Sequence, residues 1–538
     1  MIKARIFLIL GMWIVAACAP AQPEPVFSPF ILVTLDPNAT PTATPFQPEA
    51  NLAAPTPRFL VPADTGVPPS PTATLSPSPI PPSATPQIAA TSSGSLDGGA
   101  IVHNDGSNPA LPPASSRTNY ILYTTLDFPN RTVDVDETIR YHNTTGTQLS
   151  ELVLSIQPNR YGNCLSISSI QQDGAELTSY DMDGQRLTIN LPLSLQTDAV
   201  TTLTIRFTLN LPAKRANGLF GYDFNQVNLV DWYPFIVPYG QGWILHDPLT
   251  YGEHLVYDSA DYEVNLKTDA GVIVAASAPG EPNGDWTRYR LYGARTFALS
   301  ASDEFLSAES AVGPVGIRSY FFEGYSGAGE GMRNAAVQAV GLFAAKFAPY
   351  PYESLSVVQA DIHDGQEYDG LVFLSSDFYG QYGGSNRSNL ITIGVHEIAH
   401  EWWFGLVGND QAMEPWLDEA LAVYSERVFY EFTSGGGNLD WWWQFRVDFF
   451  DPGGYVDTTI YQGGAFRPYT NAVYLNGAHF MEEFRNRMGD GDFYRFLENY
   501  AAQFSRRRAT GQDFFAVARQ NTNKDLSDLI SRYFQNSY

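Results

Sequence analysis

Two histidines and a glutamate within Val395–Trp403 have the spacing that a metal-activated water requires. His396 and His400 are four residues apart in a largely apolar run with helical character. Residues four apart on a helix lie about 5–6 Å apart on one face, so both imidazoles can bind one ion. Glu397 then lies beside that ion and can accept a proton from a water molecule. This pattern alone also fits two core histidines with satisfied hydrogen bonds.

A third ligand favours the metal site over the core interpretation. Glu419, within Trp416–Ala422, begins a second predicted helix, and eighteen residues separate it from His400. Two neutral imidazoles and one carboxylate suit Zn²⁺, because they hold the ion while a fourth position stays open. We therefore predict one zinc ion bound by His396, His400 and Glu419, with Glu397 as general base.

The motif and its continuation resemble the M1 aminopeptidase family, the gluzincins with a thermolysin-like catalytic domain. The likeness rests on H-E-x-x-H, eighteen residues, and then Glu419 within Trp-Leu-Asp-Glu-Ala. Tyr474-Leu475-Asn476-Gly477 is similar to the family's Y-x-K-G element, with Asn476 in place of the lysine. The resemblance implies that Tyr474 donates a hydrogen bond to the oxyanion, a role for which a neutral phenol is suited. Tyr469 is the alternative candidate, and a half-buried tyrosine at a helix start is the purely structural interpretation.

The segment Asp364–Leu371 is similar to the family's G-x-M-E-N strand, whose glutamate binds the substrate's free α-amine. Asp364, Gln366 and Tyr368 replace its glycine, methionine and asparagine, whereas Glu367 retains the glutamate. A carboxylate at a cleft edge forms a charge-assisted bond with an ammonium group, which selects a free N-terminus. A solvated acidic turn is the alternative interpretation of Glu367.

Glu426 follows Glu419 by seven residues, two turns along the same predicted helix face. It matches a family glutamate, and the resemblance implies that it orients an imidazole ligand. A surface salt-bridge partner is the competing interpretation.

Two kinds of hydrophobic pattern divide the rest of the chain into domains. Residues 116–310 alternate polar and apolar side chains, which predicts an antiparallel β-sandwich or open β domain. Residues 311–538 are expected to form an α+β, thermolysin-like zinc peptidase domain, so that the fold class is multidomain. Its helices are predicted at 329–347, 391–404, 415–432, 474–488 and 492–504, and its buried strands at 355–358 and 371–374.

The first residues resemble a bacterial lipoprotein signal. Lys3 and Arg5 precede a ten-residue, mostly apolar run, and Val15-Ala16-Ala17-Cys18 follows. Residues 1–17 are expected to be the signal peptide and Cys18 the lipidated residue, with an ordinary cleaved signal as the alternative. Residues 18–115, rich in Pro, Thr and Ser, are expected to form a disordered linker. Cys164 is then left as an unpaired structural cysteine.

Composition excludes some partners and leaves others open. The 538 residues carry a formal charge of -26, which argues against binding of nucleic acid and against binding of anionic lipid through a cluster of basic residues. The expected membrane contact is the lipid anchor alone, on the outer face of a bacterial membrane. We expect the family's large C-terminal helical domain to be missing and the cleft to be more open for that reason.

These features predict a zinc-dependent aminopeptidase that acts on peptides with a free N-terminus. A zinc metallo-endopeptidase would share everything except the amine-binding glutamate. A surface binding protein on a peptidase scaffold is the third hypothesis, but it would need none of the catalytic residues. The sequence does not disclose the preferred first residue of the substrate.

Overall fold

The computed structural model describes residues 117–215, 218–434 and 436–538, all of which belong to one unit. The predicted signal peptide, Cys18 and the predicted linker lie outside these residues. No helix among the described residues is long and apolar enough to cross a membrane.

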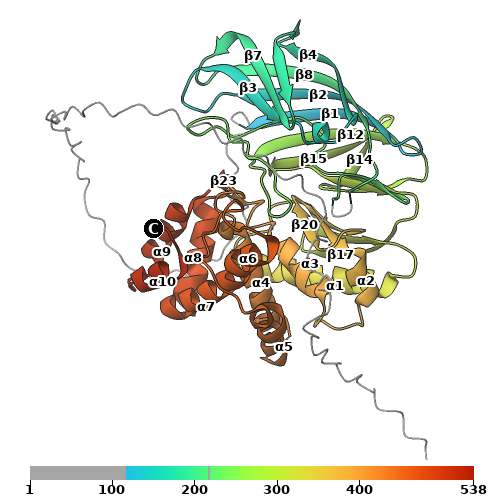
Figure 1. Ribbon diagram of the computed structural model, residues 1–538. Helices are drawn as coiled ribbons and strands as arrows, with labels where there is room; N and C mark the ends of the chain where they lie inside the picture. Colours follow the sequence, from blue (N-terminus) through green and yellow to red (C-terminus); the bar gives the residue numbers. More distant parts are fainter. Residues whose placement is uncertain (1–116, 216–217, 435) are drawn as a thin grey trace, which may run out of the picture. The chain divides into compact units, whose positions relative to one another are not determined.

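Three sheets precede the helical part of the chain, and Figure 1 shows their strands gathered above the helices. The largest has the order β14-β15-β12-β1-β2-β8-β4-β5, and two four-stranded sheets have the orders β13-β16-β10-β9 and β11-β3-β7-β6. All pairs in these sheets are antiparallel except β1 with β12. The strands are β1 (Thr118–Asp127), β2 (Thr132–His142), β3 (Leu149–Ser155), β4 (Leu165–Gln172), β5 (Ala175–Glu176), β6 (Tyr180–Asp183), β7 (Arg186–Leu195), β8 (Val200–Asn210), β9 (Gly221–Asp223), β10 (Gln226–Leu229), β11 (Phe235–Ile236), β12 (Ala260–Thr268), β13 (Ile273–Ala276), β14 (Gly280–Asn283), β15 (Trp286–Ala294) and β16 (Leu299–Ser302). This arrangement confirms the predicted β domain.

The alternating pattern of the sequence sets which face of each strand is buried. In β2 and β8 every second residue is buried, because successive side chains of a strand point to opposite faces. The buried residues include Val133, Ile139, Leu203 and Ile205, which pack into the shared core. The polar residues between them face outward.

Glu137 departs from this pattern, because it lies on the buried face of β2. Its side chain is fully buried opposite Leu122 of β1 and Ile205 of β8. Neither of its carboxyl oxygens has a hydrogen-bond partner among the described residues. Burial raises the pKa of Glu137 well above its usual range, because an ionised carboxylate would lose its hydration in the sheet core.

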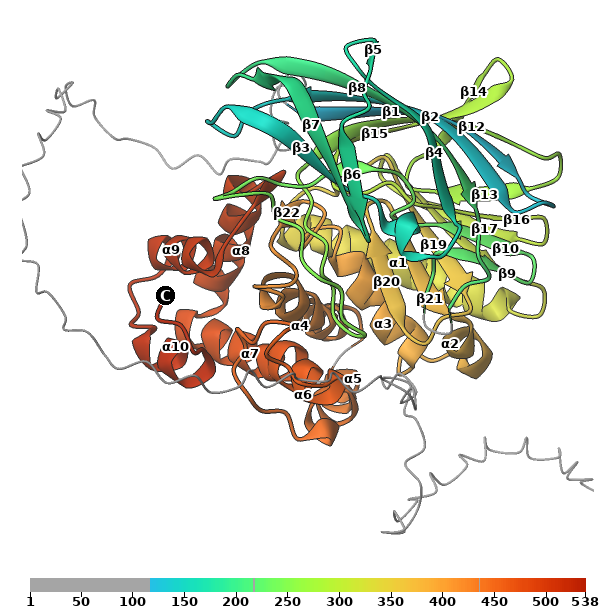
Figure 2. The ribbon, with the colours of Figure 1, turned by 45° about the horizontal axis from the view of Figure 1, so that its top comes forward.

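The part that the sequence predicts to be catalytic, called the catalytic part below, combines a five-stranded sheet with helices. The sheet has the order β17-β18-β19-β21-β20, in which β20 is an antiparallel edge strand. Its strands are β17 (Leu306–Val312), β18 (Val315–Phe321), β19 (Ser354–Ala360), β20 (Gly365–Tyr368) and β21 (Leu371–Ser375), and a small sheet pairs β22 (Val407–Gly408) with β23 (Arg507–Arg508). The helices are α1 (Ser326–Lys346), α2 (Ser376–Gln381), α3 (Asn389–Ala399), α4 (Trp416–Thr433), α5 (Gly436–Trp442), α6 (Phe466–Thr470), α7 (Asn476–Met488), α8 (Asp490–Gln503), α9 (Gly511–Asn521) and α10 (Ser527–Tyr533). The central helix α3 packs on α1, on α4 and on β20 and β21, as Figure 2 shows.

The prediction of one helix from 391 to 404 was wrong at its end. The helix α3 stops at Ala399, and His400 is its C-cap residue. The imidazole Nδ1 of His400 donates to the Trp403 carbonyl at 3.0 Å, and the Gly405 N–H donates to the His400 carbonyl at 2.8 Å. The chain therefore turns directly after the second histidine, because that histidine and Gly405 satisfy the local backbone groups.

A buried arginine joins the β part to the catalytic part. Arg295, two per cent exposed, donates to the carbonyls of Phe404 (2.6 Å) and Arg507 (2.8 Å). Asp369, just after β20, accepts from the backbone N–H groups of Arg295 and Thr296 at 2.9 and 2.8 Å. These contacts fix the β part against the strand that carries Glu367.

Candidate active site

Three predicted metal ligands lie together at the start of α4 and the end of α3. The Nε2 atom of His396 lies 3.2 Å from His400 Nε2 and 3.2 Å from Glu419 Oε2, and the remaining separation is 3.6 Å. A tetrahedral zinc ion with bonds near 2.0–2.1 Å places its ligand atoms about 3.3 Å apart. The three donor atoms therefore fit Zn²⁺ in spacing as well as in chemical type.

The opposite nitrogen of each imidazole is held by the protein. Nδ1 of His396 donates to Glu426 Oε1 at 3.0 Å, and Nδ1 of His400 donates to the Trp403 carbonyl. These bonds fix the tautomer in which both Nε2 atoms keep a free lone pair. Both histidines are buried, at five and two per cent exposure, so the ligand geometry is set by packing.

Glu397 lies on α3 beside the ligand cluster and faces strand β20. A Cβ atom on Gly365 would collide with the Glu397 carboxylate, so only glycine allows this approach of the strand. Burial raises the pKa of Glu397 to about 8, although the neighbouring His396 and His400 oppose the shift. The resemblance places Asp364 at the family's glycine and predicts no role for Gly365.

Tyr474 reaches the cluster from the other side. It lies in a π-helical turn, Asn471–Leu475, that precedes α7, and not in the regular helix that the sequence predicts. Its hydroxyl donates to Glu419 Oε1 at 2.5 Å, and its ring stacks on His396 at a centroid distance of 6.1 Å. The alternative candidate, Tyr469, is almost fully buried behind Tyr474. The structure thus brings Tyr474 to the ligands.

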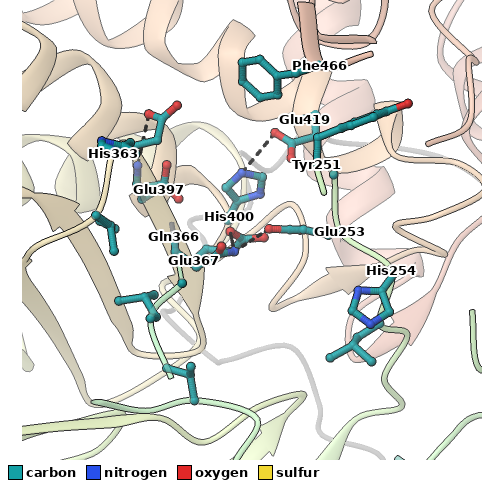
Figure 3. Close-up of a pocket in the computed structure, with 18 of the residues that line it drawn as sticks. Tyr251, Glu253, His254, His363, Gln366, Glu367, Glu397, His400, Glu419 and Phe466 are labelled. Atoms are coloured by element: carbon teal, nitrogen blue, oxygen red, sulfur yellow. Dashed lines mark hydrogen bonds and ion pairs between the residues drawn. The ribbon is translucent and has the colours of Figure 1, made fainter. Parts of the chain in front are cut away.

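Glu367 lies on β20 and meets a second glutamate that sequence reasoning missed. Gln366 Nε2 donates to Glu367 Oε2 at 2.9 Å and to Glu253 Oε1 at 2.5 Å. Gln411 Nε2 donates to Glu367 Oε1 at 3.2 Å and also to Glu253 Oε2. Two amides therefore bridge two carboxylates, and Figure 3 shows the two glutamates pointing toward one another beside His400.

The electrostatics of this glutamate pair favour a cation. Burial, followed by the charge of Glu367, raises the pKa of Glu253 well above its usual range. Burial also raises the pKa of Glu367 to about 7. A bound ammonium group would relieve this repulsion between two buried carboxylates. Glu253 lies in a loop of the β part, and no motif in its own segment marks it.

Glu426 lies in the core of the catalytic part and not on the surface. Its side chain is fully buried on α4 and accepts from His396, from Trp442 Nε1 at 2.7 Å and from Arg446. The competing interpretation as a surface salt-bridge partner is therefore wrong. Trp442 and Arg446 were not identified from the sequence, because they come from a segment whose spacing shows no motif.

The site opens into a cavity of about 440 Å³. The metal-ligand cluster, Glu397, Tyr474 and the glutamate pair all border it. Apolar and aromatic side chains of the β part form another wall: Tyr161, Leu219, Phe220, Val230 and Leu255. A chain end could therefore enter with its amine at the glutamate pair and its first peptide bond at the ligands.

Comparison with known proteins agrees with this geometry. Residues 334–533 match the Peptidase family M1 domain. Aminopeptidase M1-B of Oryza sativa subsp. japonica is 24% identical over 233 residues, which are 40% of this chain and 26% of the relative. Aminopeptidase M1-D of the same plant is 22% identical over 234 residues, with the same coverage. The chain thus matches about a quarter of the length of these curated relatives.

Solved structures share the fold over most of the described residues. The M1 zinc metallopeptidase from Deinococcus radiodurans is 18% identical, with a TM-score of 0.56, over 76% of this chain and 90% of that chain. A mutant of it bound to the substrate Tyr-Ser-Ala gives 17% identity and a TM-score of 0.57, over 81% and 98%.

The domain match and the fold are those of M1 zinc metallopeptidases, and the ligand set suits a zinc ion. More narrowly, the helical part of the chain matches the peptidase family M1 domain, and its β part is similar in fold to that of M1 zinc metallopeptidases.

Proposed function

We propose that the protein is a zinc-dependent aminopeptidase that removes N-terminal residues from peptides. The observation that best supports this proposal is the pair Glu253 and Glu367, which two amides hold beside the metal-ligand cluster. An ammonium group bound there fixes the distance from the chain's N-terminus to the reacting carbonyl. An endopeptidase would have no use for two buried carboxylates at this point.

The reaction divides among the residues of the cavity. Bound by His396, His400 and Glu419, zinc would supply polarisation of the scissile carbonyl and acidification of a water molecule toward a pKa of about 7. Glu397 accepts the proton of that water and later delivers it to the leaving amine. Tyr474 donates its hydroxyl proton in a hydrogen bond to the carbonyl oxygen as negative charge develops there.

The test uses matched substrates and the purified full chain. Fluorogenic aminoacyl amides should be hydrolysed, a chelator should abolish the activity, and added Zn²⁺ should restore it. A peptide and its N-acetylated form should differ by at least about 100-fold in kcat/KM, since the ammonium bond is charge-assisted. Equal cleavage of the two forms would establish an endopeptidase instead. No cleavage together with full zinc occupancy would support a binding protein.

We further propose that the protein acts outside the cytoplasmic membrane, held by lipid on Cys18. The support is the basic start, the short apolar run and the Val-Ala-Ala-Cys sequence. Metabolic labelling with an alkyne fatty acid should mark the wild-type chain but not the Cys18→Ser variant. Labelling of both chains to the same extent would contradict the anchor.

A further inference from the structure

Glu426 is a hub of hydrogen bonds directly behind the metal-ligand cluster. Its Oε1 accepts from His396 Nδ1 at 3.0 Å, and its Oε2 accepts from Trp442 Nε1 at 2.7 Å. Arg446 approaches the same carboxylate with two nitrogens, Nε to Oε2 at 3.0 Å and Nη2 to Oε1 at 2.9 Å. Four donors thus fix one carboxylate in position and in rotation.

The end of α5 and the π-helical turn that follows it position two of these donors. Trp442 ends α5, and Arg446 lies in the π-helical turn Trp443–Val447 that follows. The indole thus comes from the end of α5, and the π turn brings the guanidinium to the same carboxylate. π-helical turns are rare and are found frequently at functional sites. Trp442 is fully buried and the Arg446 side chain is 11% exposed, so both contacts are shielded from water.

Among the donors to Glu426 that the described residues provide, Arg446 carries the formal positive charge when His396 is neutral. A carboxylate that is completely buried requires such a partner, because an unpaired buried charge is strongly destabilising. The bidentate contact also prevents the carboxylate from turning away from the imidazole. Loss of Arg446 would leave two single-point donors, and the His396 ring would lose its fixed direction.

We propose that Arg446 is a positioning residue of the metal centre. It holds the Glu426 carboxylate, which in turn holds the His396 ring, and so it raises the affinity of the site for Zn²⁺. The inference rests on the proposed zinc ligands and adds a residue that acts on His396 through Glu426. Removing a partner that contacts a ligand imidazole typically costs 10–100-fold in metal affinity; Arg446 acts through such a partner, Glu426, so this range is the upper limit of its effect.

The chain contains a second bidentate arginine–glutamate pair on the same helix, with a buried arginine and a half-buried carboxylate. Arg485 is four per cent exposed and donates to Glu431 at 2.7 and 3.1 Å, also in a bidentate contact. Glu431 lies on α4, five residues beyond Glu426, but it makes no contact with the ligand histidines. Arg485→Met should therefore report what the loss of a bidentate arginine pair on α4 does to stability alone, and this effect should be the smaller one, because Glu431 is 27% exposed and keeps Arg427 as a partner.

The experiment compares zinc affinity in the full chain and four variants by competition with a chromophoric chelator. Arg446→Met should weaken zinc binding by up to about 10–100-fold, and Arg446→Lys, which keeps the charge but not the bidentate contact, should lie between. Arg485→Met should lower the melting temperature yet bind zinc within about twofold of wild type. Glu419→Ala should lose zinc binding.

The Co²⁺-substituted protein gives a second readout that mere destabilisation would not move. Its visible absorption band should shift in Arg446→Lys, which remains folded, and should be unchanged in Arg485→Met. Equal zinc affinity and equal Co²⁺ spectra in wild type and the Arg446 variants would overturn the inference. Wild-type zinc affinity in Glu419→Ala would instead overturn the proposed metal site itself.

Discussion

The substitution Glu253→Gln tests whether the β part of the chain helps to bind the substrate's amine. Glu253 Oε1 accepts from Gln366 at 2.5 Å, and Glu253 Oε2 accepts from Gln411. Glutamine keeps the length of the side chain and removes its charge. One of its two terminal atoms becomes an NH₂ group, which cannot accept a hydrogen bond from a neighbouring amide.

The size of the effect follows from the contacts. A hydrogen bond to a charged group contributes about 1.5–3 kcal/mol, and each 1.4 kcal/mol corresponds to a factor of ten. Removing one of two carboxylates should thus lower kcat/KM for free-amine substrates by about 10–150-fold. The fall in kcat/KM should not exceed this range, because Glu367 still binds the ammonium group. It should lie above the lower end, because one neighbouring amide also loses its hydrogen-bond acceptor.

The assay is kcat/KM on an aminoacyl amide and on its N-acetylated form. Glu253→Gln should lose activity on the free amine only, so that the preference for a free N-terminus shrinks by the same factor. Glu281→Gln is the control, because Glu281 is exposed on β14 and pairs with Arg288. A change below threefold, in a variant that retains its zinc, would refute the role of Glu253.

Three further substitutions test separate features. Glu397→Gln should retain stoichiometric zinc and lose kcat by at least about 100-fold, measured by elemental analysis and turnover; near-normal turnover would exclude Glu397 as the base. Tyr474→Phe should lower kcat by about 10²–10³ with little change in KM, whereas a change confined to KM would indicate a binding role. Glu137→Leu should stabilise the fold increasingly as pH rises. Above a pH of about 4.3 the unfolded chain releases the Glu137 proton, whereas the folded chain keeps it. The free energy of unfolding of the wild type therefore falls by up to about 1.4 kcal/mol per pH unit. This fall continues until the pH reaches the raised pKa of Glu137 in the folded chain. Thermal unfolding at pH 4, 5.5 and 7 measures this, and a constant gap between the two proteins would contradict it.

Local periodicity was sufficient to predict much of the fold and the central ligands. Alternating burial in β2 and β8, and the helical spacing that brings His396 and His400 onto one face of α3, depend only on neighbours within a few residues. The end of α3 was predicted wrongly, because the bond from the His400 imidazole to the Trp403 carbonyl replaces the continuing helix.

The sequence by itself determined the type of chemistry, since the spacing of His396, His400 and Glu419 already specifies a ligand set. Only the tertiary structure decided what surrounds that set. Glu253 reaches Gln411 from 158 residues away in the chain. Such contacts carry no periodic signal, because they exist only after Arg295 and Asp369 have joined the β part to the catalytic part. The spacing of residues along the chain thus predicts the metal ligands, whereas the amine-binding pair depends on how two separately patterned parts of the chain pack together.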